Sequence, residues 1–378
     1  MKKFFLIAGE PSGDFHGGNL IRAIKEQHPN SSFMGHGGNS MKDEGMRIIE
    51  HVDDLSIMGF AEVLLHLPRM IKIMNNTLKT ISISKPDRII LIDYPGFNLR
   101  LAKRLSYLKI PITYFILPQA WAWKEGRVEA MKKFIDQAIS IFPFERDWFE
   151  SKGLNVNYLG HPFMDAEHLD ETTKSFYKRH SLDINSPILT LLPGSRQQEV
   201  DNHWPIYLDT VKLLRKKIVN LQVIVGKSSN IELQDCPEDF RIESNAKKAM
   251  IVGRAGLASS GTATLECAIE GLPIVVCYKL FPLSWVIAKF LVKVKYSSIV
   301  NLIMEKQVVP ELLQKSMKPK LIFNKLVKLF DDKSEERDTM LIDYEKLRTS
   351  LGSPGVYNRI AESILNRTTQ SNDKITSL

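Results

Sequence analysis

The chain has 378 residues, of which 44% are hydrophobic and 25% are charged, and this balance excludes a mostly disordered protein. At about 100–200 residues per domain, the length predicts two domains. Lysine and arginine outnumber aspartate and glutamate by 51 to 43, and the net charge of +8 favours anionic partners such as phosphates, nucleic acid or acidic lipid surfaces. A proteome whose average protein is basic explains the excess equally well.

The cysteines and the apolar runs limit where the protein works. Cys236, Cys267 and Cys277 are too few and too scattered for a disulfide framework or a zinc site, which fits a reducing cytosol. The apolar run from Phe4 to Ala8 is too short for a secretion signal and indicates a first buried strand. No stretch of about 18 or more apolar residues occurs, so the sequence predicts no membrane-spanning helix.

Short apolar runs alternate with longer amphipathic stretches, and this alternation predicts βαβ units and parallel sheets. In chain order, the predicted strands are Lys3–Ala8, Ser32–Met34, Arg88–Ile92, Ile112–Ile116, Gln137–Ile141, Asn157–Leu159, Ile188–Leu192, Leu221–Val225, Ala249–Val252, Ala255–Ala258 and Ile274–Tyr278. The helices predicted between them include Gly17–Gln27, Leu99–Tyr107, Pro205–Lys217 and Thr262–Glu270, and the segment Lys318–Asn366 is helical in pattern.

The alternation pauses in the polar stretch between Pro162 and Ser186, and this pause predicts a domain boundary. We expect an α/β fold of two Rossmann-like, doubly wound domains, an N-terminal one over residues 1–170 and a second over 171–340. C-terminal helices over residues 341–366 should pack back on the N-terminal domain, and the polar residues 367–378 should form a frayed tail. Two such domains facing each other would direct the carboxyl ends of their strands into a central cleft, where ligands of these sheets bind.

The segment Ser259–Glu266 (SSGTATLE) follows an apolar strand and opens a predicted helix. Its hydroxyls can cap the helix, Gly261 permits close approach of a ligand to the backbone, and free N–H groups with the helix dipole attract phosphate. Thr262 and Glu266 lie one turn apart on one face, so Glu266 could accept hydrogen bonds from a ribose diol. A plain N-capped helix is the alternative, and neither GxxxxGK[ST] nor GxGxxG occurs in the chain.

A second motif, Leu191–Arg196 (LLPGSR), directly follows a predicted strand of the second domain. The guanidinium fork of Arg196 suits a pyrophosphate leaving group. A turn that carries a surface arginine is the alternative. The chain has no Asp-x-Asp pair of the kind that holds a metal with a sugar nucleotide, so an arginine and a helix terminus are the predicted phosphate partners and no metal is expected.

Titratable side chains gather in loops of the N-terminal domain. Asp93 follows the apolar run RIILI within IDYPGFN (92–98), where a carboxylate could take a proton from an attacking hydroxyl. Alternatively, Asp93 caps the helix that follows. The first loop adds Glu10, Asp14 and His16 to the same edge of the predicted sheet, an unusual set for a plain connection.

Ordered motifs over most of the chain resemble those of the lipid-A-disaccharide synthase family, whose members are inverting glycosyltransferases of GT-B architecture. The resemblance runs from residue 8 to about 314 and continues more weakly through residues 351–362 (LGSPGVYNRIAE). The matching stretches are AGEPSGDFHG (8–17), SIMGFAEVL (56–64), IDYPGFNLRLAK (92–103), LPQAWAWKEGR (117–127), FPFE (142–145), LGHPF (159–163), LLPGSRQQEV (191–200), SGTATLE (260–266) and VNLIMEKQVVPELLQ (300–314).

The resemblance implies a transferase that joins UDP-2,3-diacylglucosamine to 2,3-diacylglucosamine 1-phosphate (lipid X). The product would be a β(1→6)-linked disaccharide 1-phosphate, with release of UDP, in lipid A biosynthesis. The residues on the family's nucleotide-site motifs are Arg196, Glu266 and Asn301, with Ser260, Gly261 and Thr262 at the phosphates. No cofactor is required by this scheme.

The resemblance also makes Asp93 the leading candidate for the general base that acts on the acceptor 6-hydroxyl. Glu10, Asp14 and His16 are the reserve candidates. An unperturbed Asp, with a pKa of about 3.9, is a weak base for an alcohol. We therefore expect proton transfer to be late and concerted with formation of the new C–O bond.

Both implied substrates carry acyl chains, so the resemblance implies a cytoplasmic enzyme that is peripheral on the anionic inner-membrane surface of a Gram-negative bacterium. Segment Met58–Met74 has a polar stripe beside a wide apolar face, as interfacial helices do, and Pro68 should break or bend it. The side chains predicted to face membrane or acyl chains are Phe60, Val63, Leu64, Leu67, Met70 and Ile71. An ordinary core helix is the alternative. A second apolar segment, Phe281–Lys295, is too short to span a bilayer.

Two other functions compete with this interpretation. Another GT-B transferase or an epimerase acting on a UDP-sugar is distinguished by whether UDP release depends on lipid X. A membrane-surface or nucleic-acid-binding module is suggested by the charge, but no RNP motif and no lysine run with interleaved aromatics occurs, so no nucleic acid is expected. Trp121 and Trp123 could stack on bases, although packing near the cleft explains them better. The sequence leaves the oligomeric state open, a homodimer included.

Overall fold

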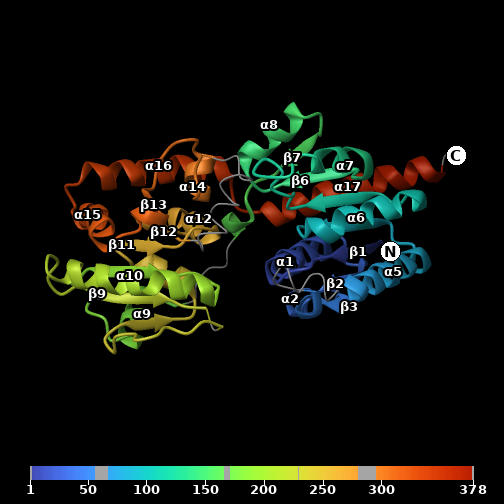
Figure 1. Cartoon of the computed structure of the whole chain (residues 1–378). Coiled ribbons are helices and arrows are strands. Elements are labelled where there is room, and N and C mark those ends of the chain that lie inside the picture. The colour runs from blue at the N-terminus through green and yellow to red at the C-terminus, as the bar shows by residue number, and fades with distance from the viewer. Residues whose placement is uncertain (1, 56–66, 166–170, 229, 280–294, 377–378) are drawn as a thin grey trace. The chain divides into compact units, whose positions relative to one another are not determined.

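The computed structural model describes residues 2–55, 67–165, 171–228, 230–279 and 295–376, and the chain divides into two compact units (Figure 1). Unit 1 comprises Met1–Ala166 and Leu351–Leu378, and unit 2 comprises Glu167–Ser350. Each unit is built on one parallel sheet with helices packed beside it. The fold class predicted from the alternation of strands and helices is therefore confirmed.

The described part of unit 1 contains a seven-stranded parallel sheet in the order β3-β2-β1-β4-β5-β6-β7. The strands are β1 Lys3–Ile7, β2 Ser32–Gly37, β3 Arg47–His51, β4 Arg88–Ile92, β5 Ile112–Phe115, β6 Gln137–Ser140 and β7 Val156–Tyr158. The strand order reverses between β1 and β4. Ligands of open parallel sheets bind beyond the carboxyl ends of the strands at such a switch point. The loops after β1 and β4 are thus the expected binding position of unit 1.

Helices bury both faces of this sheet, because successive side chains of a strand point to opposite faces. Phe4 and Leu6 of β1 pack in the same core as side chains of α1 and α17, whereas Phe5 and Ile7 pack with those of α5 and α6. The helices of unit 1 are α1 Pro11–Gln27, α2 Asn39–Asp43, α3 Val52–Leu55, α5 Leu67–Ser84, α6 Pro95–Leu105, α7 Arg127–Phe134, α8 Pro143–Ser151 and α17 Val356–Thr376, with 3-10 turns at Ser106–Leu108 and Pro162–Asp165. Burial on both faces explains why these strands read as continuous apolar runs.

The C-terminal helix α17 belongs to unit 1 and packs on α1, as the sequence predicted (Figure 1). The prediction is wrong for residues 341–350, which lie in α16 and belong to unit 2. The buried Arg88 Nε donates to Thr368 Oγ1 at 2.8 Å, and Lys2 Nζ donates to Leu365 O at 3.2 Å. These bonds tie α17 to β4 and to the start of the chain. The helix runs to Thr376, so helical structure replaces the predicted frayed tail over most of residues 367–378. Composition alone could not reveal the buried partner of Thr368.

The described part of unit 2 contains a six-stranded parallel sheet in the order β10-β9-β8-β11-β12-β13. The strands are β8 Ile188–Leu192, β9 Gln222–Gly226, β10 Arg241–Glu243, β11 Ala255–Ala258, β12 Ile274–Tyr278 and β13 Glu311–Leu313. The helices are α9 Thr173–Arg179, α10 Gln197–Arg215, α11 Ala246–Val252, α12 Thr262–Ile269, α14 Ile299–Ile303, α15 Pro319–Phe330 and α16 Glu335–Leu351, with a 3-10 turn at Gln314–Ser316. The order reverses between β8 and β11, so the loops after these two strands form the switch point of unit 2.

Most predicted strands coincide with observed ones, but the strand predicted over Ala249–Val252 is wrong. These residues lie in α11, whose N-cap Asn245 accepts a hydrogen bond from the Lys248 N–H group at 3.2 Å. A short apolar run does not distinguish a strand from a buried helix. The strands that the sequence missed, β3, β10 and β13, all lie at sheet edges, where one side lacks a neighbour and the apolar pattern is weaker.

Candidate active site

Asp93 follows β4 at the switch point of unit 1, in a backbone conformation that most residues avoid. Asp93 and Tyr94 both have positive φ, 44° and 50°. The Asp93 carbonyl oxygen accepts hydrogen bonds from Tyr114 Oη at 2.8 Å and from Asn98 Nδ2 at 2.7 Å, and the Asp93 N–H group donates to Phe115 O at 3.1 Å. These bonds hold the strained turn and thereby fix the backbone position from which the Asp93 carboxylate projects.

The electrostatic surroundings of Asp93 favour its protonated form. The pKa of Asp93 is raised to about 6, first by burial and then by the Glu10 carboxylate, against the opposing effects of the Tyr94 N–H group and the Arg127 charge. Asp93 is therefore ionised at neutral pH yet more basic than an ordinary aspartate.

The loops after β1 and β4 pack closely against each other. A Cβ on Gly9 would lie 2.3 Å from the Tyr94 ring, so glycine is needed at this position.

The three reserve candidates differ in their surroundings. Glu10 is exposed. Asp14 is buried and accepts hydrogen bonds of 2.6, 2.9 and 3.1 Å from three backbone N–H groups around the start of α2, so its carboxylate holds that loop. His16 Nδ1 lies 2.7 Å from Tyr357 Oη of α17, and burial lowers the pKa of His16 to about 4. The His16 imidazole is therefore neutral at pH 7. Among the three reserve candidates, only Glu10 is an exposed carboxylate.

The structure adds Glu145, a carboxylate without a predicted role. Glu145 lies in the first turn of α8 and is buried. Its Oε1 accepts a hydrogen bond from Trp121 Nε1 at 2.9 Å, and its Oε2 accepts one from the Phe142 N–H group at 3.2 Å. The pKa of Glu145 is raised to about 7, chiefly by burial, and the Asp93 charge acts in the same direction. The FPFE motif contained this residue, but only the fold shows its link to the tryptophan and to Asp93.

Arg196 lies at the switch point of unit 2, between β8 and α10. Its side chain is 68% exposed, and its Nη1 lies 3.8 Å from Glu199 Oε1. The loop that carries it is held by the buried His203, whose Nδ1 lies 3.0 Å from Pro193 O and whose Nε2 accepts a hydrogen bond from the Lys279 N–H group at 3.1 Å. A guanidinium on a fixed loop and open to solvent is available to an anion.

The second loop of this switch point joins β11 to α12. Gly261 has φ 131° and ψ −160°, a conformation that residues with a side chain rarely adopt, and a Cβ there would meet nothing within 4 Å. Thr262 is exposed at the start of the helix, where unpaired N–H groups favour an anion. Ser260 Oγ donates to Ser297 O at 2.9 Å, so this serine anchors the loop. The open space at Gly261 lies at the helix terminus that the sequence predicted for phosphates.

Asn301 is buried and its amide is fully used within unit 2. Its Oδ1 accepts hydrogen bonds from the N–H groups of Val308 at 2.7 Å and Val309 at 2.9 Å, and its Nδ2 donates to Glu311 Oε1 at 2.8 Å. Glu311, which had no predicted role, also accepts a hydrogen bond from the Ser297 N–H group at 2.9 Å. Asn301 therefore supports, through Glu311 and Ser297, the loop that anchors Ser260.

Glu266 lies one turn into α12 and is half-buried. The pKa of Glu266 is raised to about 7, chiefly by burial, with Lys247 opposing and Glu270 assisting the shift. Lys247 Nζ is paired with Glu270 Oε1 at 3.1 Å. A carboxyl group with this pKa is partly protonated near neutral pH, so it can both donate to and accept from a diol.

Helix α5 carries the described part of the predicted membrane-facing set. Phe60, Val63 and Leu64 lie outside the described residues, as does the side chain of Leu67. Met70 packs against the core of unit 1, in contrast to the predicted membrane-facing position, whereas Ile71 is 49% exposed. Pro68 stands in the first turn of the described α5, where proline is tolerated, and the part of the predicted segment before Leu67 lies outside the described residues.

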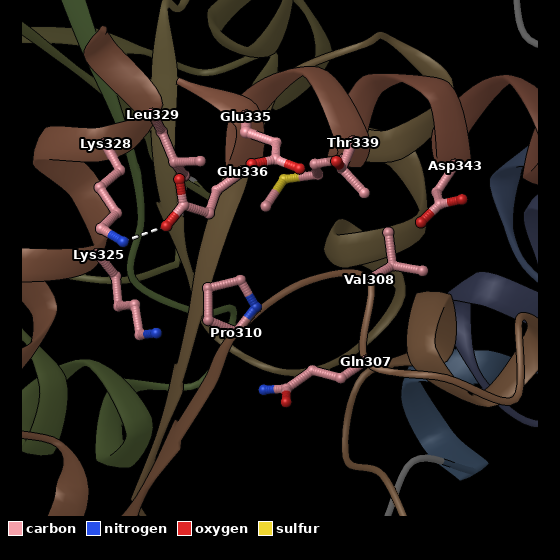
Figure 2. A pocket seen from close by; sticks show the side chains of 11 residues that line it. Gln307, Val308, Pro310, Lys325, Lys328, Leu329, Glu335, Glu336, Thr339 and Asp343 are labelled. Carbon is pink, nitrogen blue, oxygen red and sulfur yellow. Dashed lines mark hydrogen bonds and ion pairs between the residues drawn. The ribbon is translucent and has the colours of Figure 1, made fainter. Parts of the chain in front are cut away.

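A separate hollow of about 450 Å³ lies in unit 2, and Figure 2 shows its lining side chains. It is formed by the loop Gln307–Pro310 with parts of α15 and α16. Lys328 and Glu336 form an ion pair at its wall (Figure 2). Its lining includes none of the residues predicted for the nucleotide site, so the hollow is a different part of unit 2.

The described ranges contain neither a metal-binding cluster nor a membrane-spanning helix. No group of three or more His, Cys, Asp or Glu side chains there could hold a metal ion. Across the same residues, every helix is too short or too polar to cross a bilayer.

Comparisons with known proteins agree with the fold and the motifs. A family model described as lipid-A-disaccharide synthetase matches residues 4–364. A lipid-A-disaccharide synthase of Myxococcus xanthus is 33% identical over 371 residues, which cover 96% of this chain and 97% of the relative. A second such synthase, from Solibacter usitatus, is 34% identical over 364 residues, 94% of this chain and 95% of the relative. The solved glycotransferase of kitacinnamycin, with 11% identity, superposes with a TM-score of 0.68 over 97% of this chain and 98% of that one, which shows a GT-B-like fold.

Proposed function

The chain belongs to the lipid-A-disaccharide synthase family and is a glycosyltransferase of lipid A biosynthesis, and from this premise we propose how its two units share the reaction. Unit 1 binds the acceptor, 2,3-diacylglucosamine 1-phosphate (lipid X). Unit 2 binds the donor, UDP-2,3-diacylglucosamine. The assignment is supported by the chemistry of the two switch points, since one presents carboxylates and the other an arginine beside a helix terminus.

The proposed reaction is a single displacement with inversion at the anomeric carbon of the donor. The oxygen of the acceptor 6-hydroxyl forms the new C–O bond, the bond between that carbon and UDP breaks with its electrons leaving on UDP, and Asp93 takes the hydroxyl proton. The observation that carries the proposal is the half-buried carboxylate of Asp93 on a fixed backbone turn, since its pKa of about 6 suits a general base at neutral pH. This pKa makes Asp93 a stronger base than the sequence suggested.

The departing UDP carries the charge that the second site has to stabilise. Arg196 can bind the diphosphate with two parallel N–H groups, and the N-terminus of α12 adds the N–H groups at Thr262. Such preorganised donors are among the strongest contributions an enzyme makes to group transfer. Glu266, one turn further along α12, would bind the ribose diol.

The lipid substrates also support a peripheral position on an anionic membrane surface. Ile71 is the exposed apolar residue near the start of α5 that remains available for this contact. Flotation of the full-length protein with vesicles rich in phosphatidylglycerol tests it. Ile71→Glu should reduce binding, whereas Ile83→Glu at the far end of α5, where the side chain is 72% exposed, should not. Equal binding by wild type and Ile71→Glu would contradict a membrane role for this residue.

UDP release by the full-length protein tests the function itself. With UDP-2,3-diacylglucosamine as donor, UDP should appear only when lipid X is also present, and the lipid product should have the mass of the disaccharide 1-phosphate. UDP-N-acetylglucosamine, which lacks the acyl chains, serves as the control donor and should not be consumed. Conversion of the donor at the same rate without lipid X would indicate an epimerase or a hydrolase instead.

A further inference from the structure

The segment Trp123–Arg127, which leads into the first residue of α7 in unit 1, places two cations on one aromatic ring. Trp123 is 38% exposed. Lys124 Nζ lies 4.4 Å from the centroid of its ring, and the Arg127 guanidinium carbon lies 4.6 Å from it. Lys124 has a φ of 56°, and the Arg127 N–H group donates to Lys124 O at 3.0 Å, so a tight turn brings the two cations together. Contact with the ring restricts both side chains before any ligand arrives.

The acidic residues within this segment and in the first turn of α7 are already paired with other lysines. Glu125 Oε1 pairs with Lys152 Nζ at 2.6 Å, and Glu129 Oε1 pairs with Lys132 Nζ at 3.0 Å. Within the described part of the chain, no ion pair joins Lys124 or Arg127 to a carboxylate. Two positive charges therefore stand next to each other without an ion-pair partner among the described residues, and an anion is the ligand that such a pair attracts.

Arg127 also lies within electrostatic range of the proposed base. Its charge acts on Asp93 and on the Tyr114 side chain, and Tyr114 Oη is hydrogen-bonded to the Asp93 carbonyl oxygen at 2.8 Å. The cation pair is thus on the unit, and in the part of that unit, where the acceptor would react. The diphosphate of the donor has its own proposed partners in unit 2, so the anion at this second place belongs to the acceptor.

We propose that Trp123, Lys124 and Arg127 bind the phosphate monoester of the acceptor sugar. This inference rests on the proposed function, which supplies an acceptor with a phosphate on its anomeric carbon. The planar guanidinium of Arg127 takes two phosphate oxygens, Lys124 supplies a second charge, and Trp123 holds both in place. The site fixes one end of the sugar while the 6-hydroxyl at the other end approaches Asp93, so it sets the acceptor's orientation and selects a phosphorylated acceptor.

The test measures UDP release by the full-length protein in micelles of a neutral detergent, with two acceptors. One is 2,3-diacylglucosamine 1-phosphate, and the other is the same lipid with a hydroxyl in place of the phosphate. Arg127→Ala should raise KM for the phosphorylated acceptor about tenfold, with KM for the donor unchanged. For the acceptor without phosphate, wild type and Arg127→Ala should have the same KM. Arg127→Lys keeps the charge but loses the guanidinium fork. Its KM for the phosphorylated acceptor should lie between the values of the wild type and Arg127→Ala.

Controls separate the proposal from general damage. Arg146→Ala removes an arginine of α8 that is half exposed and bonded to Asp147 of its own helix, and KM for both acceptors should stay at the wild-type value. The melting temperature of Arg127→Ala should remain near that of the wild type. If the melting temperature falls, Lys124→Ala replaces Arg127→Ala as the test variant, because Lys124 is exposed. This variant should raise KM only for the phosphorylated acceptor.

Several results would overturn the proposal. An equal loss with both acceptors would show that Arg127 acts through Asp93 or the fold instead of through the phosphate. An unchanged KM for the phosphorylated acceptor, combined with weaker binding of Arg127→Ala to phosphatidylglycerol vesicles, would assign the cations to a membrane lipid. Wild-type protein that releases no UDP with either acceptor would refute the proposed function, and this inference with it, whereas the first two results leave the proposed function intact.

Discussion

The two switch points share one topology and present opposite chemistry. In unit 1 the loops after β1 and β4 hold carboxylates, and burial raises the pKa of Asp93 to about 6. In unit 2 the loops after β8 and β11 hold Arg196, which is 68% exposed, and Gly261, whose surroundings are open. In the proposed function, partial burial of an acid would produce a base that works near neutral pH, whereas a cation and N–H groups left exposed would form an anion site. The sheet supplies the position, and the side chains decide the chemistry.

The largest expected effect comes from removing the proposed base. Asp93→Asn should lower kcat about a thousandfold, since general-base catalysis contributes about 10²–10⁴-fold, and KM for the donor should stay near the wild-type value. Single-turnover assays at saturating concentrations of both substrates measure the loss of catalytic rate. Asp147→Asn, at an exposed position of α8, is the matched control and should retain full activity. An Asp93→Asn protein with near-normal turnover would transfer the role to Glu10 or another acid.

A smaller effect should appear in the pH dependence of kcat/KM. Activity should rise as pH increases through about 6, where the half-buried Asp93 loses its proton in keeping with its pKa. Because the Glu10 charge raises the pKa of Asp93, Glu10→Gln should move this limb to lower pH. Rate profiles of the two proteins between pH 4 and 9 make the comparison. A limb that stays in place or moves to higher pH would contradict the electrostatic link between the two loops.

The same raised pKa has a consequence for stability. An Asp whose pKa is higher in the folded chain stabilises the fold below its unfolded value of about 4, and this contribution is lost as pH rises through about 6. Asp93→Asn removes the ionisation. Its melting temperature should therefore exceed that of the wild type by a few degrees at pH 8, with a smaller difference at pH 4. Calorimetry at both pH values checks the sign, and an equal difference at both would contradict it.

The smallest effect should come from substituting Glu311, whose hydrogen bonds hold the loops of unit 2. Glu311 accepts hydrogen bonds from the N–H groups of Ser297 and Ser298 and from Asn301 Nδ2. Glu311→Gln replaces one acceptor oxygen with a donor, so the melting temperature should fall by a few degrees and KM for the donor should rise a few-fold. KM for the acceptor should not change. Glu345→Gln, an exposed residue of α16, is the control.

The sequence predicted what depends on local pattern. The central strands β4, β8, β11 and β12 lie where their apolar runs placed them, and the loops after β4, β8 and β11 carry the residues that the motifs indicated. Local pattern fails for some short or edge elements, as it did for Ala249–Val252 and for the edge strands β3, β10 and β13. It fails again where a residue's role depends on partners far along the chain.

Three residues show this limit. Asp14 looked like a spare base, but its carboxylate holds three backbone N–H groups of a loop that follows β2. Asn301 stands in a motif assigned to the nucleotide site, and that motif does not reveal that its amide is bonded within its own unit. Glu145 stood inside a matching motif without a role, because its partner Trp121 lies on a different loop. Each assignment required tertiary contacts that spacing along the sequence does not contain.

UDP affinity, measured by calorimetry on the full-length protein, tests the division of labour most directly. The central claim is that unit 1 supplies the base and unit 2 holds the diphosphate. Asp93→Asn should bind UDP within about twofold of the wild type, whereas Arg196→Ala should bind it about tenfold more weakly, as expected for the loss of a charged hydrogen-bonding pair. Equal weakening by the two substitutions would contradict the claim, because Asp93 would then take part in holding the nucleotide.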